Sequence, residues 1–129
     1  MKIGVFDSGF GGLTVLRELV AAIPQADYLY LGDTARLPYG SKSAATITRY
    51  AVSSVEFLVD QGAEYLVIAC NTASALALDQ IRNSVSTNVL GVIGPGARAA
   101  SEITRNNRVW VIGTAATVAS HAYKRELEQ

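Results

Sequence analysis

Short apolar runs alternate along the chain with longer stretches in which apolar residues recur every three or four positions. A short apolar run fits a strand that is buried on both faces, and the longer spacing fits helices that cover such a sheet. The pattern predicts five strands, at residues 2–6, 28–31, 65–69, 89–92 and 109–112. It therefore predicts an α/β fold: a parallel doubly wound, flavodoxin-like sheet of about five strands with helices on both faces.

Helices are expected in the intervals between these strands. Pro24 and Gly62 stand where the first two amphipathic helices should end. A third helix is expected after Asn71, and a fourth from Pro95, since proline suits a first helical turn. The last helix is expected to run from about Thr117 to the end of the chain. No repeat or low-complexity segment interrupts this order.

Composition narrows the classes of partner. Half of the 129 residues are apolar, which is enough for the core of one ordinary domain. Basic and acidic residues both number 11 and form no block of like charge, so neither a nucleic acid nor a membrane is expected as a partner. No apolar run reaches about 18 residues, and the start of the chain lacks a signal-peptide layout. We expect a cytoplasmic protein that binds a small molecule.

Polar and glycine-rich segments follow the predicted strands directly. In an open parallel sheet the ligand lies beyond the carboxyl ends of the strands, where the strand order reverses. With the common order 2-1-3-4-5, the segment after the first strand faces the segment after the third. The segments are Asp7-Ser8-Gly9-Phe10-Gly11-Gly12, Gly32-Asp33 with Pro38-Tyr39-Gly40, Cys70-Asn71-Thr72, and Gly113-Thr114 with Thr117.

The glycines after the first strand allow more than one interpretation. A helix start rich in free N–H groups attracts anions. However, Thr14 stands where the dinucleotide fingerprint needs its third glycine, the P-loop lysine is absent, and Asp7 would repel a pyrophosphate. The glycines also fit a tight turn without a ligand. Neither interpretation excludes a carboxylate ligand.

Cys70 is the only cysteine, so an internal disulfide and a multi-cysteine zinc site are both excluded. Free cysteines are often core residues. Cys70, however, lies between a strand and a helix start, where N–H groups favour the reactive thiolate. Asn71 and Thr72 extend the polar patch, and Asp7 fits two roles: a proton-exchange partner of the thiol, or a cap for the following helix.

The remaining polar candidates are ambiguous on sequence alone. Thr114 and Thr117 fit a carboxylate site or a helix cap. Asp33 and Tyr39 fit ordinary loop positions. His121, the only histidine, falls inside a predicted helix, which argues against a triad with Cys70 and an aspartate.

Taken together, the motifs resemble those of the glutamate racemase family, and the resemblance covers essentially the whole chain. The most specific of them are ACNTAS and PYG. The motifs are DSGFGG from Asp7, DTARLPYG from Asp33, ACNTAS from Ala69, GVIGPG from Gly91 and GTAATVAS from Gly113.

The resemblance implies a cofactor-independent racemase that interconverts L- and D-glutamate for bacterial peptidoglycan, with no metal expected. In that family two cysteines flank the substrate's α-carbon, and Cys70 matches the first. Asp7 would assist this thiol. The residues that would hold the substrate's amino and carboxylate groups are Ser8, Pro38, Tyr39, Gly40, Asn71, Thr72, Thr114 and Thr117.

The family's second cysteine belongs to a later GCTH motif that this chain, ending at Gln129, does not reach. We therefore expect a chain that is inactive or weakly active alone. Residues 1–96 would form the first racemase domain without its carboxyl-terminal completion. Residues 97–129 would either begin the second domain or add a fifth strand and a helix to a single one. Without that completion the first domain would have an uncovered apolar edge, and a homodimer is another way to cover it. Aspartate racemase and a non-catalytic flavodoxin-like anion-binding domain are the alternative functions.

Overall fold

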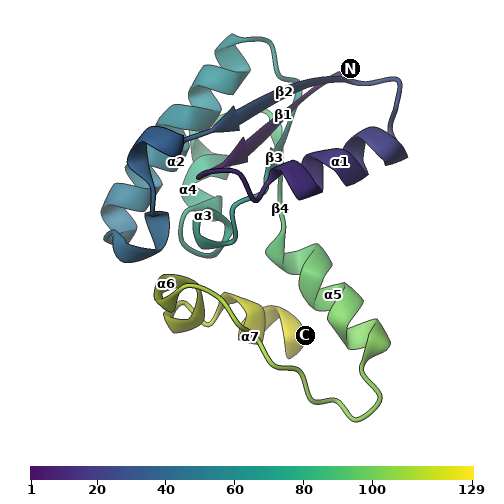
Figure 1. The fold of residues 1–129 in the computed structure, drawn as a ribbon. Helices are drawn as coiled ribbons and strands as arrows, with labels where there is room; N and C mark the ends of the chain where they lie inside the picture. Colours follow the sequence, from purple (N-terminus) through teal and green to yellow (C-terminus); the bar gives the residue numbers. More distant parts are fainter.

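The computed structural model describes all of residues 1–129 and contains one parallel sheet of four strands (Figure 1). The strands are β1 (Lys2–Asp7), β2 (Asp27–Gly32), β3 (Tyr65–Ile68) and β4 (Asn88–Gly91). Their order is β2-β1-β3-β4, and every pair is parallel. The predicted order of the first four strands is confirmed, so the segments that follow β1 and β3 are neighbours.

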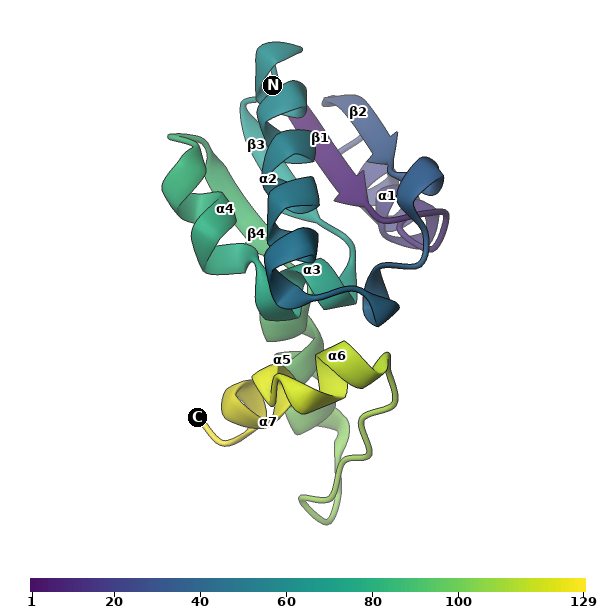
Figure 2. The same ribbon diagram turned by 90° about the vertical axis from the view of Figure 1, so that its left-hand side faces the viewer.

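Helices cover both faces of this sheet, as the doubly wound prediction required. Figure 2 shows α1 (Leu13–Ala22) and α2 (Ala44–Asp60) on opposite sides of the strands. The remaining helices are α3 (Asn71–Leu76), α4 (Leu78–Ser84), α5 (Ile93–Ile103), α6 (Ala115–Ala119) and α7 (Ala122–Leu127), with two 3-10 turns, η1 (Thr34–Arg36) and η2 (Tyr39–Ser41). None of these helices is long and apolar enough to cross a lipid bilayer.

The alternation of side chains along the strands creates two apolar layers. Phe6 and Ile68 point to the face covered by α2, where they join Ile47 in the larger core cluster. Val5 and Val67 point to the opposite face, which α1 covers. Ile47 is fully buried, and its replacement by alanine would cost about 2–5 kcal/mol because the rigid sheet cannot fill the cavity.

The carboxyl-terminal third differs most from the sequence prediction. Residues 109–112 are extended but pair with no strand, so the sheet has four strands instead of about five, and this segment does not dock onto it. The chain leaves the sheet after β4, because α5 leads beyond the carboxyl ends of the strands (Figure 1). A strand without a neighbour has no main-chain partners, and its apolar pattern alone cannot supply them.

Three helix boundaries also differ from those predicted. The helix expected from Pro95 begins two residues earlier, at Ile93. The third helix is divided at Ala77 into α3 and α4. The last helix is divided between α6 and α7, where His121 has a φ of 55°. His121 is therefore at a helix junction and not inside a helix.

Candidate functional site

Asp7 ties the glycine turn to the end of β1. Its Oδ2 accepts hydrogen bonds from the main-chain N–H groups of Gly9 (3.1 Å) and Gly12 (3.0 Å), and from the Tyr30 hydroxyl at 3.4 Å. A Cβ at Gly12 would lie 2.6 Å from the Cβ of Asp7, so only glycine lets the turn come this close. Burial, and then the negative charge and hydrogen bond of Asp7, raise the pKa of Tyr30 to about 12.

Cys70 lies across the switch point from this turn, as the strand order predicted. Its thiol donates to the Ser8 hydroxyl at 3.4 Å, and its sulfur accepts the Ala73 N–H at 3.4 Å. Only 5% of Cys70 is exposed. No hydrogen bond joins the thiol to Asp7, whose Oδ2 is already bonded to the turn. The direct partner of the thiol is therefore Ser8.

Three threonine hydroxyls form a closed network beside Cys70. The Thr72 and Thr114 oxygens are 2.9 Å apart, Thr114 and Thr117 are 2.9 Å apart, and Thr72 and Thr117 are 3.3 Å apart. Thr114 also caps α6 by accepting the Thr117 N–H at 3.2 Å. The capping role of Thr114 is confirmed, and the same hydroxyl joins α6 to α3. Thr72 and Thr117 are buried, whereas Thr114 is exposed.

The Pro38-Tyr39-Gly40 segment forms a wall beside the threonine network. A Cβ at Gly40 would lie 2.6 Å from the Cβ of Thr114, so the Gly40 backbone is in close contact with the Thr114 side chain. Tyr39 is 2% exposed, and its ring packs against Phe6 with centroids 6.2 Å apart. Its side chain therefore points into the core, and Tyr39 can offer a ligand only its main chain. Pro38, which precedes it, is exposed.

Asp33 anchors this wall, although its position in the sequence fits an ordinary loop. Its carboxylate accepts the Tyr39 hydroxyl and pairs with Arg36 Nε at 2.7 Å, while Asp33 itself is 8% exposed. The Arg36 guanidinium stacks over the Tyr50 ring at 4.2 Å. Burial, and then the hydrogen bond and charge of Asp33, raise the pKa of Tyr39 above its usual range.

Sequence reasoning missed the roles of Asp33, Arg36 and Tyr30. A signal was available for Asp33, which follows β2 directly and so meets the rule that selected the other candidates. Arg36 and Tyr30 carry no such signal, because their importance depends on contacts with Asp33 and Asp7.

Four main-chain N–H groups in η2 and α3, two elements that contact each other, have no acceptor in the chain. They belong to Tyr39 and Gly40 in η2 and to Asn71 and Thr72 at the start of α3. Free N–H groups at a helix start are donors for an anion. Asn71 itself is exposed, and its Oδ1 accepts the Tyr123 hydroxyl. The thiol, the hydroxyls and these donors together suit the carboxylate and α-carbon of an amino acid.

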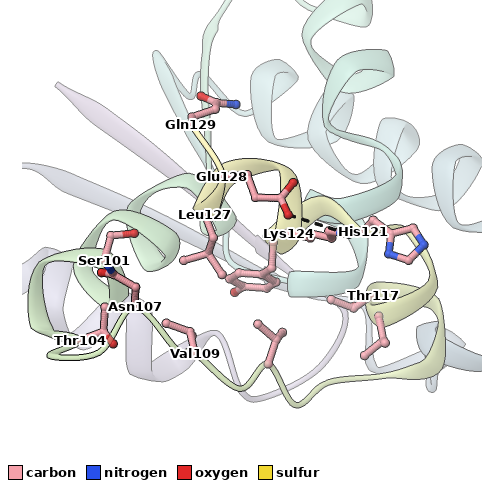
Figure 3. Close-up of a pocket in the computed structure, with 13 residues that line it drawn as sticks. Ser101, Thr104, Asn107, Val109, Thr117, His121, Lys124, Leu127, Glu128 and Gln129 are labelled. Atoms are coloured by element: carbon pink, nitrogen blue, oxygen red, sulfur yellow. Dashed lines mark ion pairs between the residues drawn. The ribbon is translucent and has the colours of Figure 1, made fainter.

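Two cavities lie beside the coil at residues 104–114, and neither is lined by Cys70. One of about 650 Å³ separates this coil from α7 (Figure 3), and another of about 470 Å³ lies beside it. Thr117 lines both cavities. The first is lined by His121 but by no thiol, and His121 makes no side-chain hydrogen bond to Cys70. Neither cavity contains the thiol, so the candidate site is assigned from the chemistry around Cys70 and not from cavity size.

No group of three or more His, Cys, Asp or Glu side chains in the structure could hold a metal ion.

Comparison with known proteins identifies the family. The family described as Asp/Glu/Hydantoin racemase matches residues 3–129. A glutamate racemase of Koribacter versatilis is 61% identical over 127 residues, covering 98% of this chain and 44% of the relative. The structure of the glutamate racemase from Aquifex pyrophilus superposes with a TM-score of 0.97 at 52% identity, over 99% of this chain and 51% of that one.

A glutamate racemase from Francisella tularensis in complex with D-glutamate superposes with a TM-score of 0.90 at 43% identity, over 98% of this chain and 47% of that one. The chain thus spans about half the length of the curated relatives it matches. Sequence motifs, fold and comparison agree, and this chain belongs to the Asp/Glu/hydantoin racemase family.

Proposed function

We propose that this chain provides the half of a glutamate racemase site that carries the first of the two catalytic thiols. In this half-site, Cys70 exchanges the α-proton on one face of the glutamate α-carbon. The observation that carries the proposal is the buried Cys70 thiol, bonded to Ser8 at the sheet's switch point. The relatives described above are named glutamate racemases, which favours glutamate over aspartate. The product would serve peptidoglycan synthesis, as the family resemblance implies.

The surroundings of Cys70 fit the demands of this proton transfer. An α-proton is very weakly acidic, so its removal needs a base shielded from water and donors aimed at the charge that develops on the carboxylate. Burial shields the sulfur, and Ser8 fixes its position. In the proposal, the free N–H groups of Gly40 and Thr72 and the hydroxyl of Thr114 hold the carboxylate.

Asp7 acts indirectly in this scheme. Its carboxylate holds the glycine turn through Gly9 and Gly12, and the turn carries Ser8 to the thiol. Asp7 would therefore be a positioning residue. No hydrogen bond joins Asp7 to the thiol, and direct proton exchange with Cys70 would have to use Oδ1, because Oδ2 is bonded to the turn.

Inversion requires a proton donor on the face opposite the base. The chain has a single cysteine, so we expect exchange of the α-proton without inversion when it acts alone. Within the proposal, residues 1–96 are the first racemase domain and residues 97–129 begin the second. The proposal includes a cytoplasmic location, because a thiol that must stay free suits a reducing compartment.

The test is to incubate the chain with L- or D-glutamate in deuterated water. Proton NMR follows loss of the α-proton signal, and chiral chromatography follows inversion. We expect exchange of one enantiomer, abolished in Cys70→Ser and retained in the exposed-serine control Ser53→Ala. Exchange that persists in Cys70→Ser would exclude the thiol as the base. Absence of both exchange and saturation-transfer contact with glutamate would overturn the proposal for this chain.

A further inference from the structure

The Asn71 side chain is tied to α7 by one hydrogen bond. Its Oδ1 accepts the hydroxyl of Tyr123, which lies on α7, whereas Asn71 begins α3 directly after Cys70. Burial raises the pKa of Tyr123, so its hydroxyl stays protonated at neutral pH and acts as the donor. The bond therefore joins the residue beside the thiol to the carboxyl-terminal end of the chain.

This bond determines which end of the Asn71 amide is free. A side-chain amide has an oxygen that accepts hydrogen bonds and an NH2 group that donates them, and rotation about χ2 exchanges their places. With Oδ1 held by Tyr123, the NH2 group remains, and it donates to no acceptor within the chain. Asn71 therefore offers a ligand N–H donors, which suit a carboxylate and not an ammonium group.

Tyr123 is held in place through the helices on either side of it. The Ser120 hydroxyl donates to the Thr117 carbonyl at 2.6 Å and accepts the Ala122 N–H at 3.2 Å, which fixes the start of α7 against α6. The Tyr123 ring also fits against α5, where a Cβ at Gly96 would lie 3.6 Å from its Cε1. Figures 1 and 2 show α6 and α7 beyond the end of the sheet at which α3 begins. The hydroxyl is thus presented to Asn71 by a supported ring.

The Asn71 side chain also shares its surroundings with the threonine network. The cavity of about 470 Å³ is lined by Asn71, Thr114, Thr117 and Tyr123, among others. Thr114 and Thr117 are joined by their hydroxyls to Thr72, the residue that follows Asn71. The amide therefore lies among the groups that the proposed function assigns to the substrate carboxylate.

We propose that Tyr123 is a positioning residue for the glutamate site, whose hydroxyl holds the Asn71 amide in the one orientation that turns its NH2 group to the substrate carboxylate. Tyr123 acts through Asn71 and does not touch the substrate. Without the hydroxyl the amide is free to rotate and to present its oxygen, which repels a carboxylate. This inference rests on the proposed function and deepens it by giving α7 a part in substrate binding.

Tyr123→Phe tests the hydrogen bond alone, because it removes the hydroxyl and keeps the ring against α5. NMR titration with each enantiomer of glutamate gives the Kd, and the saturating rate of α-proton exchange is measured in deuterated water. We expect Tyr123→Phe to weaken binding about three- to tenfold and to leave the saturating rate within about twofold, since the thiol is untouched. The control, Tyr28→Phe, removes a hydroxyl that bonds to the Leu19 and Ile23 carbonyls and should leave the Kd unchanged.

A double-mutant cycle separates positioning from a merely structural role. In an Asn71→Ala background, Tyr123→Phe should change the Kd less than about twofold, because the amide that it positions is gone. In the ligand-free protein, Tyr123→Phe should shift the carbon-13 signal of the Asn71 side-chain carbonyl, which loses its donor. Equal weakening with and without the Asn71 amide, or an unchanged carbonyl signal, would overturn the inference.

The outcomes also separate this inference from the proposed function. Glutamate binding that depends on Tyr123, without any α-proton exchange, supports the positioning role and removes the proposed activity. Binding and exchange that are both unaffected by Tyr123→Phe keep the proposed function and overturn the inference. Absence of glutamate binding to the unaltered chain overturns both.

Discussion

Replacing Asp7 with alanine should destabilise the fold more than loss of any exposed carboxylate. Asp7 is 6% exposed, and its Oδ2 is the acceptor for the N–H groups of Gly9 and Gly12. A hydrogen bond to a charged group contributes about 1.5–3 kcal/mol, and a buried donor left unpaired costs a similar amount. Because one oxygen serves both donors and water reaches part of the turn, we expect a loss of about 3 kcal/mol.

Asp7→Asn keeps a carbonyl acceptor of the same shape and should cost only about 1 kcal/mol. Urea unfolding followed by far-UV circular dichroism measures both variants. With an m-value of about 2 kcal/mol per molar, the alanine variant should unfold at about 1.5 M less urea than the parent. Glu56→Ala, which removes an exposed carboxylate from α2, should stay within about 0.5 kcal/mol. Equal midpoints for Asp7→Ala and Glu56→Ala would refute the argument that Asp7 holds the turn.

Three further predictions follow from other contacts. Gly40→Ala should cost about 1–3 kcal/mol in thermal unfolding, because its Cβ would overlap Thr114. Tyr30 should ionise near pH 12 in an ultraviolet titration, and its stabilising contribution, complete below pH 10, should disappear as the pH rises through 12. Ser74→Ala should cost about 1–2 kcal/mol in urea unfolding, since the serine hydroxyl accepts the Val92 N–H.

Each of these has a matched control. Gly11→Ala adds a methyl group where nothing lies within 4 Å, so it should leave the melting temperature nearly unchanged. Tyr30→Phe should remove the tyrosine that ionises near pH 12, and an unaltered titration curve would contradict the assignment. Ser53 lies on the exposed side of α2, so Ser53→Ala is the control for Ser74→Ala. If the two substitutions destabilise the protein equally, the buried hydroxyl of Ser74 contributes nothing specific.

The sequence by itself determined the sheet and the neighbourhood of the site. Apolar runs alternating with helical spacing are local patterns, and the strand order that they allow brings Ser8 beside Cys70. The motifs predicted membership of the racemase family, and the comparison with known proteins confirmed it. Thr114 was also a predictable cap, because capping depends on residues only three positions apart.

Tertiary structure decided the contacts between segments far apart in sequence. Asp33 became a buried anchor only because Tyr39 folds back into the core beside Phe6. Asp7 bonded to the glycine turn and not to the thiol, since the turn offers two N–H groups at close range.

The segment at residues 109–112 shows the same limit most clearly. Its sequence is a short apolar run of the kind that predicts a strand, but a strand forms only where another strand supplies main-chain partners, and α5 carries this segment away from the sheet. Local sequence sets which conformation a segment prefers, whereas pairing and burial depend on which other segments lie within reach.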